Sequence, residues 1–217
     1  MKNKPNEWVS ISDLMAGVMA VVMLMLVISV VQNQFAAAKR QEEKRRGEDT
    51  EQRKLTTLLR EMRATMEGQG DSDLLDFNEV EGKITLRDRV FGRGSACVIP
   101  EARLALSRIA PKIAAFIGSS SQTQVSVQGH TDNLKVLRPV TDYARYCTVY
   151  DDNITLSAAR AREARILLIQ ALSEEQARRV IVAGLGDSQP LPGIPPEDER
   201  NRRVEVQFAN RLALKGQ

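Results

Sequence analysis

A carboxylic acid lies just inside a long apolar segment near the start of this 217-residue chain. The segment WVSISDLMAGVMAVVMLMLVISV contains Asp13, and the eighteen residues from Leu14 to Val31 carry no ionisable group. That length of apolar sequence is typical of a membrane-spanning helix. A carboxylate within a membrane span costs roughly 2.5–3.5 kcal/mol, so an acid there usually has a function. The alternative is a shallow Asp13 that contacts lipid headgroups and water.

Histidine and cysteine are scarce in this chain, which has one and two of them. The only histidine is His130, and no base–nucleophile pair stands beside it, so we predict no enzymatic activity and no cofactor. Cys97 and Cys147 have no neighbouring cysteine or histidine at metal-ligand spacing, which argues against a structural zinc site. In an exported domain they could form one disulfide, whereas in the cytosol they would remain thiols. The net charge is only +3 and no basic stripe is present, so we expect no nucleic-acid partner.

We interpret residues 9–31 as an uncleaved transmembrane helix that follows a short cytoplasmic tail, residues 1–8. A signal peptide is the alternative, because the alanines at 36–38 would suit cleavage. However, the apolar part of a signal peptide normally spans about 7–15 residues and does not begin with an acid. Five basic residues lie within residues 39–46, after the span, against Lys2 and Lys4 before it. The positive-inside rule would then place the C-terminal part in the cytoplasm, so charge alone leaves the orientation open.

Residues 32–70 are predicted to form a helical linker. Its second half carries an apolar stripe at three- and four-residue spacing, which is typical of an amphipathic helix: Leu55, Leu58, Leu59, Met62 and Met66. Two interpretations stay open. The segment is either a solvated spacer with a weak coiled-coil face, or a helix that pairs with its twin or lies on the membrane surface.

Residues 71–217 have the composition of an α/β domain. The segments KITLRD, QVSVQG, RVIVAGLG and RRVEVQFA have the alternation of strands. PEARLALSRIAPKIAAFIG and ITLSAARAREARILLIQAL read as helices, and a short helix begins at Ser173 with Gln176 as its capping-box partner. This order predicts an α/β two-layer sandwich, a mixed sheet with helices on one face.

Four blocks of this region resemble, in order, the signature of the OmpA-like peptidoglycan-binding domain: GHTDN, NITLSAARA, GLGDSQPL and NRRVEV. FGRGSACVIPEA is similar to the first strand and turn of that family, so the resemblance covers roughly residues 74–210. It implies that Asp132 and Arg160 grip the diaminopimelate of the wall peptide, with Thr131 and Asn153 at supporting positions. Such a site needs a carboxylate for the ammonium and a guanidinium for the carboxylate. It also implies that His130 is part of the pocket wall.

The segment WVSISDLMAGVM is similar to the part of the flagellar stator B subunit (MotB) in which a Trp precedes an Asp-Leu/Phe-Met core. This second resemblance implies a single-pass protein of the bacterial inner membrane, with its N-terminus cytoplasmic and its C-terminal domain periplasmic. It implies a homodimer inside a ring of polytopic A subunits (MotA/ExbB-like), anchored to peptidoglycan. Asp13 would carry the transported proton or sodium ion, with Ser12 as an adjacent oxygen. The stripe at residues 55–66 would occupy the position of the family's plug.

The chain differs from the flagellar proteins in its short N-terminal tail and in a span without Phe or Tyr. The short tail, the SISDLMAG core and an insertion that bears Cys147 look more like the B subunit of the Zorya anti-phage defence system. A flagellar stator B subunit and a passive membrane-tethered wall anchor are the alternatives.

Residues 133–155 form an insertion that is longer than the usual loop of the OmpA-like domain. A bond between Cys97 and Cys147 would staple it to the domain, and an intermolecular bond across the dimer is the alternative. The sequence leaves open whether the insertion keeps the wall-binding pocket accessible.

Overall fold

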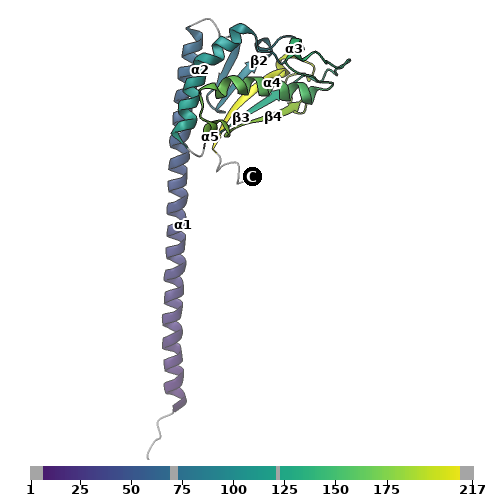
Figure 1. Ribbon diagram of the computed structural model, residues 1–217. Coiled ribbons are helices and arrows are strands. Elements are labelled where there is room, and N and C mark those ends of the chain that lie inside the picture. The colour runs from purple at the N-terminus through teal and green to yellow at the C-terminus, as the bar shows by residue number, and fades with distance from the viewer. Residues whose placement is uncertain (1–6, 69–72, 121–122, 211–217) are drawn as a thin grey trace, which may run out of the picture. The chain divides into compact units, whose positions relative to one another are not determined.

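The computed structural model describes residues 7–68, 73–120 and 123–210 (Figure 1), and within them the side chains of all residues except 7–13, 48 and 210. The chain divides into two compact units, Met1–Glu51 and Gln52–Gln217. The first unit is described as one continuous stretch of helix α1, which extends over Glu7–Glu67 and continues into the second unit.

The second unit is built on a five-stranded sheet with the strand order β1-β2-β5-β3-β4. Strands β3 and β4 pair in parallel, whereas the other neighbouring strands are antiparallel. The sheet is therefore mixed, as the sequence predicts. The strands are β1 (Leu75–Asn78), β2 (Lys83–Arg87), β3 (Thr123–His130), β4 (Val180–Gly186) and β5 (Arg203–Asn210).

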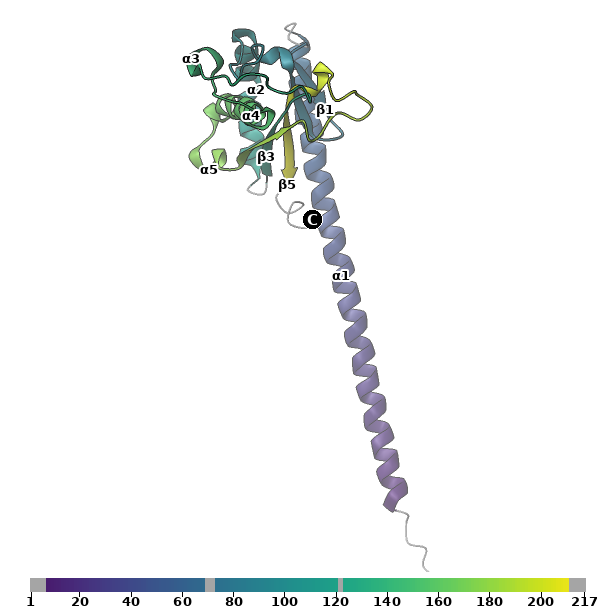
Figure 2. The same ribbon diagram turned by 90° about the vertical axis from the view of Figure 1, so that its right-hand side faces the viewer.

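Helices α2 (Pro100–Ser119) and α4 (Asn153–Leu168) cover one face of the sheet, which confirms the predicted two-layer sandwich (Figures 1 and 2). Pro100 stands in the first turn of α2, and the Asp152 side chain caps α4 by accepting from the Thr155 N–H at 2.6 Å. The remaining helices are short: α3 (Tyr143–Tyr146), α5 (Glu174–Ala177), η1 (Asp88–Val90), η2 (Ile169–Ala171) and η3 (Glu199–Asn201). The predicted capping box of Ser173 and Gln176 is present in α5.

Alternate residues of each strand separate the two faces of the sheet. Val125 and Val127 of β3, like Val204 and Val206 of β5, are buried against the helices. Helix α4 approaches the sheet closely because Gly129 and Gly184 have no side chain. A Cβ at Gly129 would lie 1.9 Å from the carbonyl oxygen of Ser157, so another residue would force the two layers apart.

The apolar stripe of the predicted linker belongs to the core of the second unit. Leu55, Leu59, Met62 and Met66 are buried in one cluster with residues of β1, β2 and α2. Lys112 of α2 also donates to the Thr65 hydroxyl at 3.0 Å. The compact unit therefore begins at Gln52, earlier than the expected boundary at residue 71. The solvated-spacer interpretation is wrong for residues 55–66, because the stripe packs against the same chain's own sheet.

Two further details differ from the expectation. Strand β1 was not predicted, because LDFN is only four residues long and lies close to β2. The segment FGRGSACV contains the expected turn, but its strand is reduced to an isolated bridge between Phe91 and Val98 and does not join the sheet. Its two glycines and the Ser95 N–H donating to the Gly92 carbonyl at 2.9 Å favour the turn over an extended strand.

The first unit contains the described helix segment that is long and apolar enough to cross a membrane. All described side chains from Leu14 to Val31 are exposed. An exposed apolar surface of this length is what a lipid-facing helix presents.

Candidate functional site

The residues of the predicted wall-binding pair come from different elements at one end of the sheet. Asp132 follows β3, and Arg160 lies in the second turn of α4 on the side that faces the core. They do not contact each other directly. Two residues that the sequence analysis did not assign to the site, Asp88 of η1 and Arg202 after η3, lie between them.

These four residues form a chain of alternating charge. Arg202 Nη1 lies 2.8 Å from Asp132 Oδ2, and Arg202 Nε lies 3.1 Å from Asp88 Oδ2. Arg160 Nη1 in turn lies 3.1 Å from Asp88 Oδ1. The order is carboxylate, guanidinium, carboxylate, guanidinium. We call Asp132, Arg202, Asp88 and Arg160 the ion-pair chain.

The two ends of the ion-pair chain are buried and its two middle members are accessible. Asp132 is 6% exposed and Arg160 is 2% exposed. The side chains of Asp88 and Arg202 are 30% and 28% exposed. The accessible surface of the site is therefore the Asp88–Arg202 ion pair, and the pair implied by the resemblance lies beneath it.

Arg160 is held by partners on three sides. Its Nε donates to the Ser95 carbonyl at 2.9 Å, and its guanidinium lies 5.2 Å from the centre of the Phe91 ring. Burial lowers the pKa of Arg160, and the Asp88 carboxylate opposes that shift. The FGRGSA turn thus supplies two of the contacts that fix this guanidinium.

The supporting positions lie around Asp132. The Asn153 amide donates to the carbonyl oxygens of Asp132 and Leu134, at 3.2 and 2.9 Å. Thr131 is buried, and its hydroxyl has no hydrogen-bond partner among the described residues. Asn153 therefore fixes the backbone that carries the carboxylate, while the Thr131 hydroxyl is buried beside it without a partner in the described chain.

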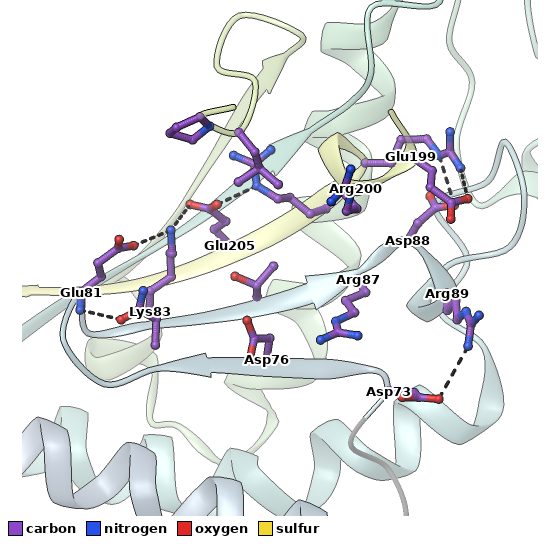
Figure 3. A pocket seen from close by; sticks show the side chains of 16 residues that line it. Asp73, Asp76, Glu81, Lys83, Arg87, Asp88, Arg89, Glu199, Arg200 and Glu205 are labelled. Carbon is purple, nitrogen blue, oxygen red and sulfur yellow. Dashed lines mark hydrogen bonds and ion pairs between the residues drawn. The ribbon is translucent and has the colours of Figure 1, made fainter. Parts of the chain in front are cut away.

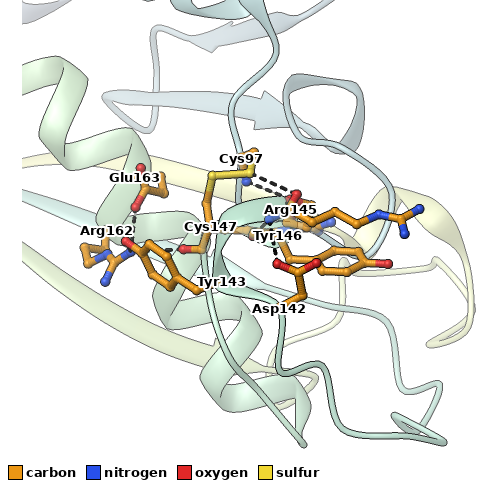
Figure 4. Close-up of a disulfide and its surroundings, with 10 residues drawn as sticks. Cys97, Asp142, Tyr143, Arg145, Tyr146, Cys147, Arg162 and Glu163 are labelled. Carbon is orange, nitrogen blue, oxygen red and sulfur yellow. Dashed lines mark hydrogen bonds and ion pairs between the residues drawn. A yellow bond between two sulfur atoms is a disulfide. The ribbon is translucent and has the colours of Figure 1, made fainter.

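The insertion packs on the turn that contacts Arg160, and a disulfide links the two segments (Figure 4). Cys97 and Cys147 are bonded within the chain, with their Cα atoms 5.1 Å apart. The Ala96 N–H donates to the Tyr146 carbonyl at 3.0 Å, and the Tyr150 hydroxyl donates to the Gly94 carbonyl at 2.6 Å. The insertion is thus packed on the turn at residues 92–97, whose Ser95 carbonyl contacts Arg160.

His130 does not line the site as expected. It is 1% exposed, on the face of the sheet opposite to the helices, and its Nε2 lies 4.0 Å from Glu205 Oε2. Burial, followed by the Arg203 cation, lowers the pKa of His130 to about 4. The imidazole is therefore neutral at pH 7. It belongs to the interior and not to the pocket wall.

A cavity of about 740 Å³ opens on this helix-free face of the sheet (Figure 3). The pair Asp88 and Arg202 forms part of its wall, so the cavity adjoins the ion-pair chain. Lys83 lies between Glu81 and Glu205, at 2.8 and 3.3 Å. Burial opposes the charge of Lys83, but the two carboxylates together raise its pKa. Burial likewise opposes the charge of Glu205, yet Arg203 and Lys83 lower its pKa.

Several arginines that the motifs contain have distinct roles. Arg203 forms a buried ion pair with Glu205 at 2.7 Å, which is structural. Arg165 donates to the carbonyl oxygens of Val180 and Ala177, at 2.8 and 2.9 Å, and so fastens α4 to the start of β4.

The side chains of Asp13 and Ser12, the candidate ion-carrying residues, lie outside the described side chains; their backbone is part of α1.

The OmpA family matches residues 90–203, which is just over half of the chain. No curated relative matches. Among solved structures, a MotB-like protein from Desulfovibrio vulgaris is 26% identical, with 74% of this chain and 99% of that chain covered and a TM-score of 0.49. The cell wall anchor of the T6SS from Pseudomonas aeruginosa is 27% identical, with 69% and 96% covered and a TM-score of 0.48.

The periplasmic domain of Helicobacter pylori MotB (residues 97–256) is 19% identical, with 65% of this chain and 92% of that chain covered and a TM-score of 0.46. Because these TM-scores lie below 0.5, family membership rests on the sequence match. The matched region contains Asp132, Arg160 and Arg202, and it begins at residue 90, so Asp88 lies outside it. On this evidence the chain belongs to the OmpA family.

Proposed function

We propose that this protein is a single-pass protein of the bacterial inner membrane whose OmpA domain binds peptidoglycan in the periplasm. Family membership supports the wall-binding part, because peptidoglycan binding is the activity that the OmpA-like resemblance implies. The apolar helix segment from Leu14 to Val31 supports the membrane part. With the domain in the periplasm and a single span, the N-terminus lies in the cytoplasm. The basic residues after the span do not oppose this orientation, because a large domain crosses the membrane largely regardless of flanking charge.

The charge order of the site is the observation that carries this proposal. Asp132 and Arg160 are complementary to a ligand with an ammonium at one end and a carboxylate at the other, such as the free end of diaminopimelate. In the ligand-free chain the Arg202–Asp88 pair presents the same two charges to them in the same order. A bound zwitterion would replace this internal pair, so no buried charge would lose its partner on binding.

The supporting residues have defined parts in this exchange. The Thr131 hydroxyl has no partner in the described chain and would hydrogen-bond the ligand beside Asp132. Asn153 would hold the Asp132 backbone through its amide, as it does without ligand.

We further propose that the protein is the B subunit of an ion-driven rotary motor. A homodimer of this chain would lie inside a ring of polytopic A subunits. Asp13 would carry a proton or a sodium ion, assisted by the Ser12 hydroxyl, since a carboxylate must be neutral when buried and ionises when hydrated. Each ion that falls through 100 mV releases about 2.3 kcal/mol. The SISDLMAG core and the cysteine-bearing insertion favour service in Zorya anti-phage defence over a flagellar stator.

Binding to the wall is tested by sedimenting the purified full-length chain with peptidoglycan sacculi. Asp132→Asn should weaken binding about tenfold or more, because a charge-assisted hydrogen bond contributes roughly 1.5–3 kcal/mol. Arg202 keeps Asp88 and Glu199 as partners in this variant, so folding should be retained. Asp151→Asn removes an exposed carboxylate of the insertion and serves as the matched control. A folded Asp132→Asn chain that sediments like the unmodified protein would refute the proposed site.

The motor is tested by ion flux into liposomes that contain the chain together with its A subunit. Asp13→Asn should abolish flux of both protons and sodium ions, whereas Asp49→Asn, farther along α1, should leave it unchanged. If Asp13→Asn supports phage resistance or motility like the unmodified chain, the protein is a passive wall anchor. Loss of phage resistance with normal motility would favour Zorya over the flagellar stator.

A further inference from the structure

The cavity on the helix-free face of the sheet has features of a second ligand site. Strands β1, β2 and β5 form its floor, and the segment from Leu191 to Arg202 contributes its wall (Figure 3). Its volume of about 740 Å³ is within the range of small-molecule sites, roughly 300–1,000 Å³.

Nearly every charged side chain that lines this cavity has a partner within the described chain. Lys83 pairs with Glu81 and Glu205, Arg203 with Glu205, and Arg89 with Asp73. Arg202 pairs with Asp88 and Glu199, and Arg200 pairs with Asp198. Two lining charges of opposite sign are left over. Among the described residues, neither Arg87 nor Asp76 has an ion-pair partner, and Figure 3 draws no dashed line from either.

The register of the strands explains why these two charges remain unpaired. Arg87 of β2 stands opposite Arg203 of β5, and Asp76 of β1 stands opposite Thr85 of β2. Like charges on directly opposed residues repel, and Glu205 is already bonded to Arg203. Arg87 therefore has a cation directly opposite it on β5. Asp76 and Arg87 are diagonal neighbours across β1 and β2, roughly 7–8 Å apart in such pairs, which an arginine side chain can span. The described chain nevertheless forms no ion pair between them, and both side chains remain exposed.

We propose that this cavity binds an amino-acid zwitterion of the wall peptide, with the ligand's carboxylate on Arg87 and its ammonium on Asp76. The Thr85 hydroxyl, between them in register, would donate to the carboxylate. A guanidinium can bind a carboxylate through two parallel hydrogen bonds, which fixes its orientation. The choice of ligand rests on the proposed function, because peptidoglycan stems supply such groups. The site is separate from the buried ends of the ion-pair chain but adjoins its exposed middle, Asp88 and Arg202.

The test is calorimetric titration of the full-length chain in detergent with meso-diaminopimelic acid. The unmodified chain should take up two molecules, one at Asp132 and Arg160 and one in the cavity. Arg87→Gln and Asp76→Asn should each weaken one binding event about fivefold, the effect of losing one partly exposed ion pair. Arg103→Gln and Asp151→Asn, at exposed positions away from the cavity, are the matched controls. Pimelate, which lacks the amines, and cadaverine, which lacks the carboxylates, should bind the cavity at least fivefold more weakly.

Both cavity variants are at accessible positions, so an unchanged melting temperature should confirm that they fold. A titration that Arg87→Gln and Asp76→Asn leave unchanged would overturn the inference, as would equal losses in the two controls. Failure of the proposed function has a different signature. In that case the chain does not sediment with sacculi, and Asp132→Asn leaves the titration unaltered. The binding event that depends on Arg87 persists and supports the cavity.

Discussion

Arg160 shows what a buried charge requires of its surroundings. With 2% of its surface exposed, the guanidinium depends on Asp88, the Ser95 carbonyl and the Phe91 ring. Removing one partner of a buried ion pair typically costs about 3–5 kcal/mol, because the other charge is left uncompensated. Asp88 is thus a positioning residue for Arg160 as well as a neighbour of the cavity.

The residues of the ion-pair chain differ in how far the sequence reveals them. Asp132 and Arg160 stand in blocks with a recognisable pattern, so a motif identifies them. Asp88 lies outside the region that matches the family, at the end of a segment that reads as an ordinary strand. Its role depends on where η1 places it in space, and no local pattern encodes that. The burial of Asp132 and Arg160 is equally invisible in the sequence, because it results from contacts with residues far along the chain, such as Ser95 and Arg202.

His130 is predicted to make the domain sensitive to mild acid. Its pKa is about 4 in the folded chain, compared with roughly 6.5 when unfolded. Between these values the unfolded state binds more protons, so the stabilisation is complete above pH 6.5 and is lost as pH falls towards 4. We expect the free energy of unfolding to fall by about 2–3 kcal/mol between pH 7 and pH 4.5 in urea titrations. A His130→Gln variant should show a flatter profile, and an equally steep one would contradict this account.

At the scale of elements, the end of α1 is the clearest lesson. Helical spacing of Leu55, Leu59, Met62 and Met66 correctly predicts an amphipathic helix. Spacing says nothing about what covers the apolar face, so a coiled coil, a membrane surface and a domain core all remain compatible with it. The structure places the stripe in the core, and the segment from Gln52 onwards is part of the folded domain.

Core membership of this segment predicts a large effect of truncating its side chains. Leu59→Ala should lower the free energy of unfolding by about 2–5 kcal/mol, because Leu59 is 0% exposed. Leu104→Ala on α2 is the matched control, since that side chain is 55% exposed and should cost well under 1 kcal/mol. Chemical denaturation of both variants measures the difference. Equal, small effects would mean that the segment is a spacer after all.

The insertion is linked covalently to the rest of the domain. The Cys97–Cys147 disulfide closes a loop with a sequence separation of 50, and it should stabilise the domain by about 2–4 kcal/mol. Dithiothreitol should therefore lower the melting temperature of the unmodified chain. A double variant, Cys97→Ser with Cys147→Ser, should already melt at the lower temperature and should not respond to the reductant. A melting temperature that reductant leaves unchanged in both proteins would contradict the stapling role.

At the scale of the whole molecule, one chain joins an apolar helix segment to a domain of the OmpA family. The sequence predicts both parts and the mixed sheet, because each rests on long, strongly patterned segments. It does not predict the start of the domain, strand β1 or the cavity. These depend on contacts between residues far apart in the chain, such as Asp76 and Thr85 beside Glu205.

The central claim is that the domain recognises a zwitterion on the wall peptide, and the choice of sacculi tests it most directly. Diaminopimelate presents an ammonium together with a carboxylate, whereas lysine at the same position of the stem presents the ammonium alone. A lysine stem would leave Arg160 without an anion if the Asp88–Arg202 pair were displaced. The full-length chain should therefore bind diaminopimelate sacculi about tenfold or more tightly than lysine sacculi in a sedimentation assay. Equal binding to the two walls would contradict the account.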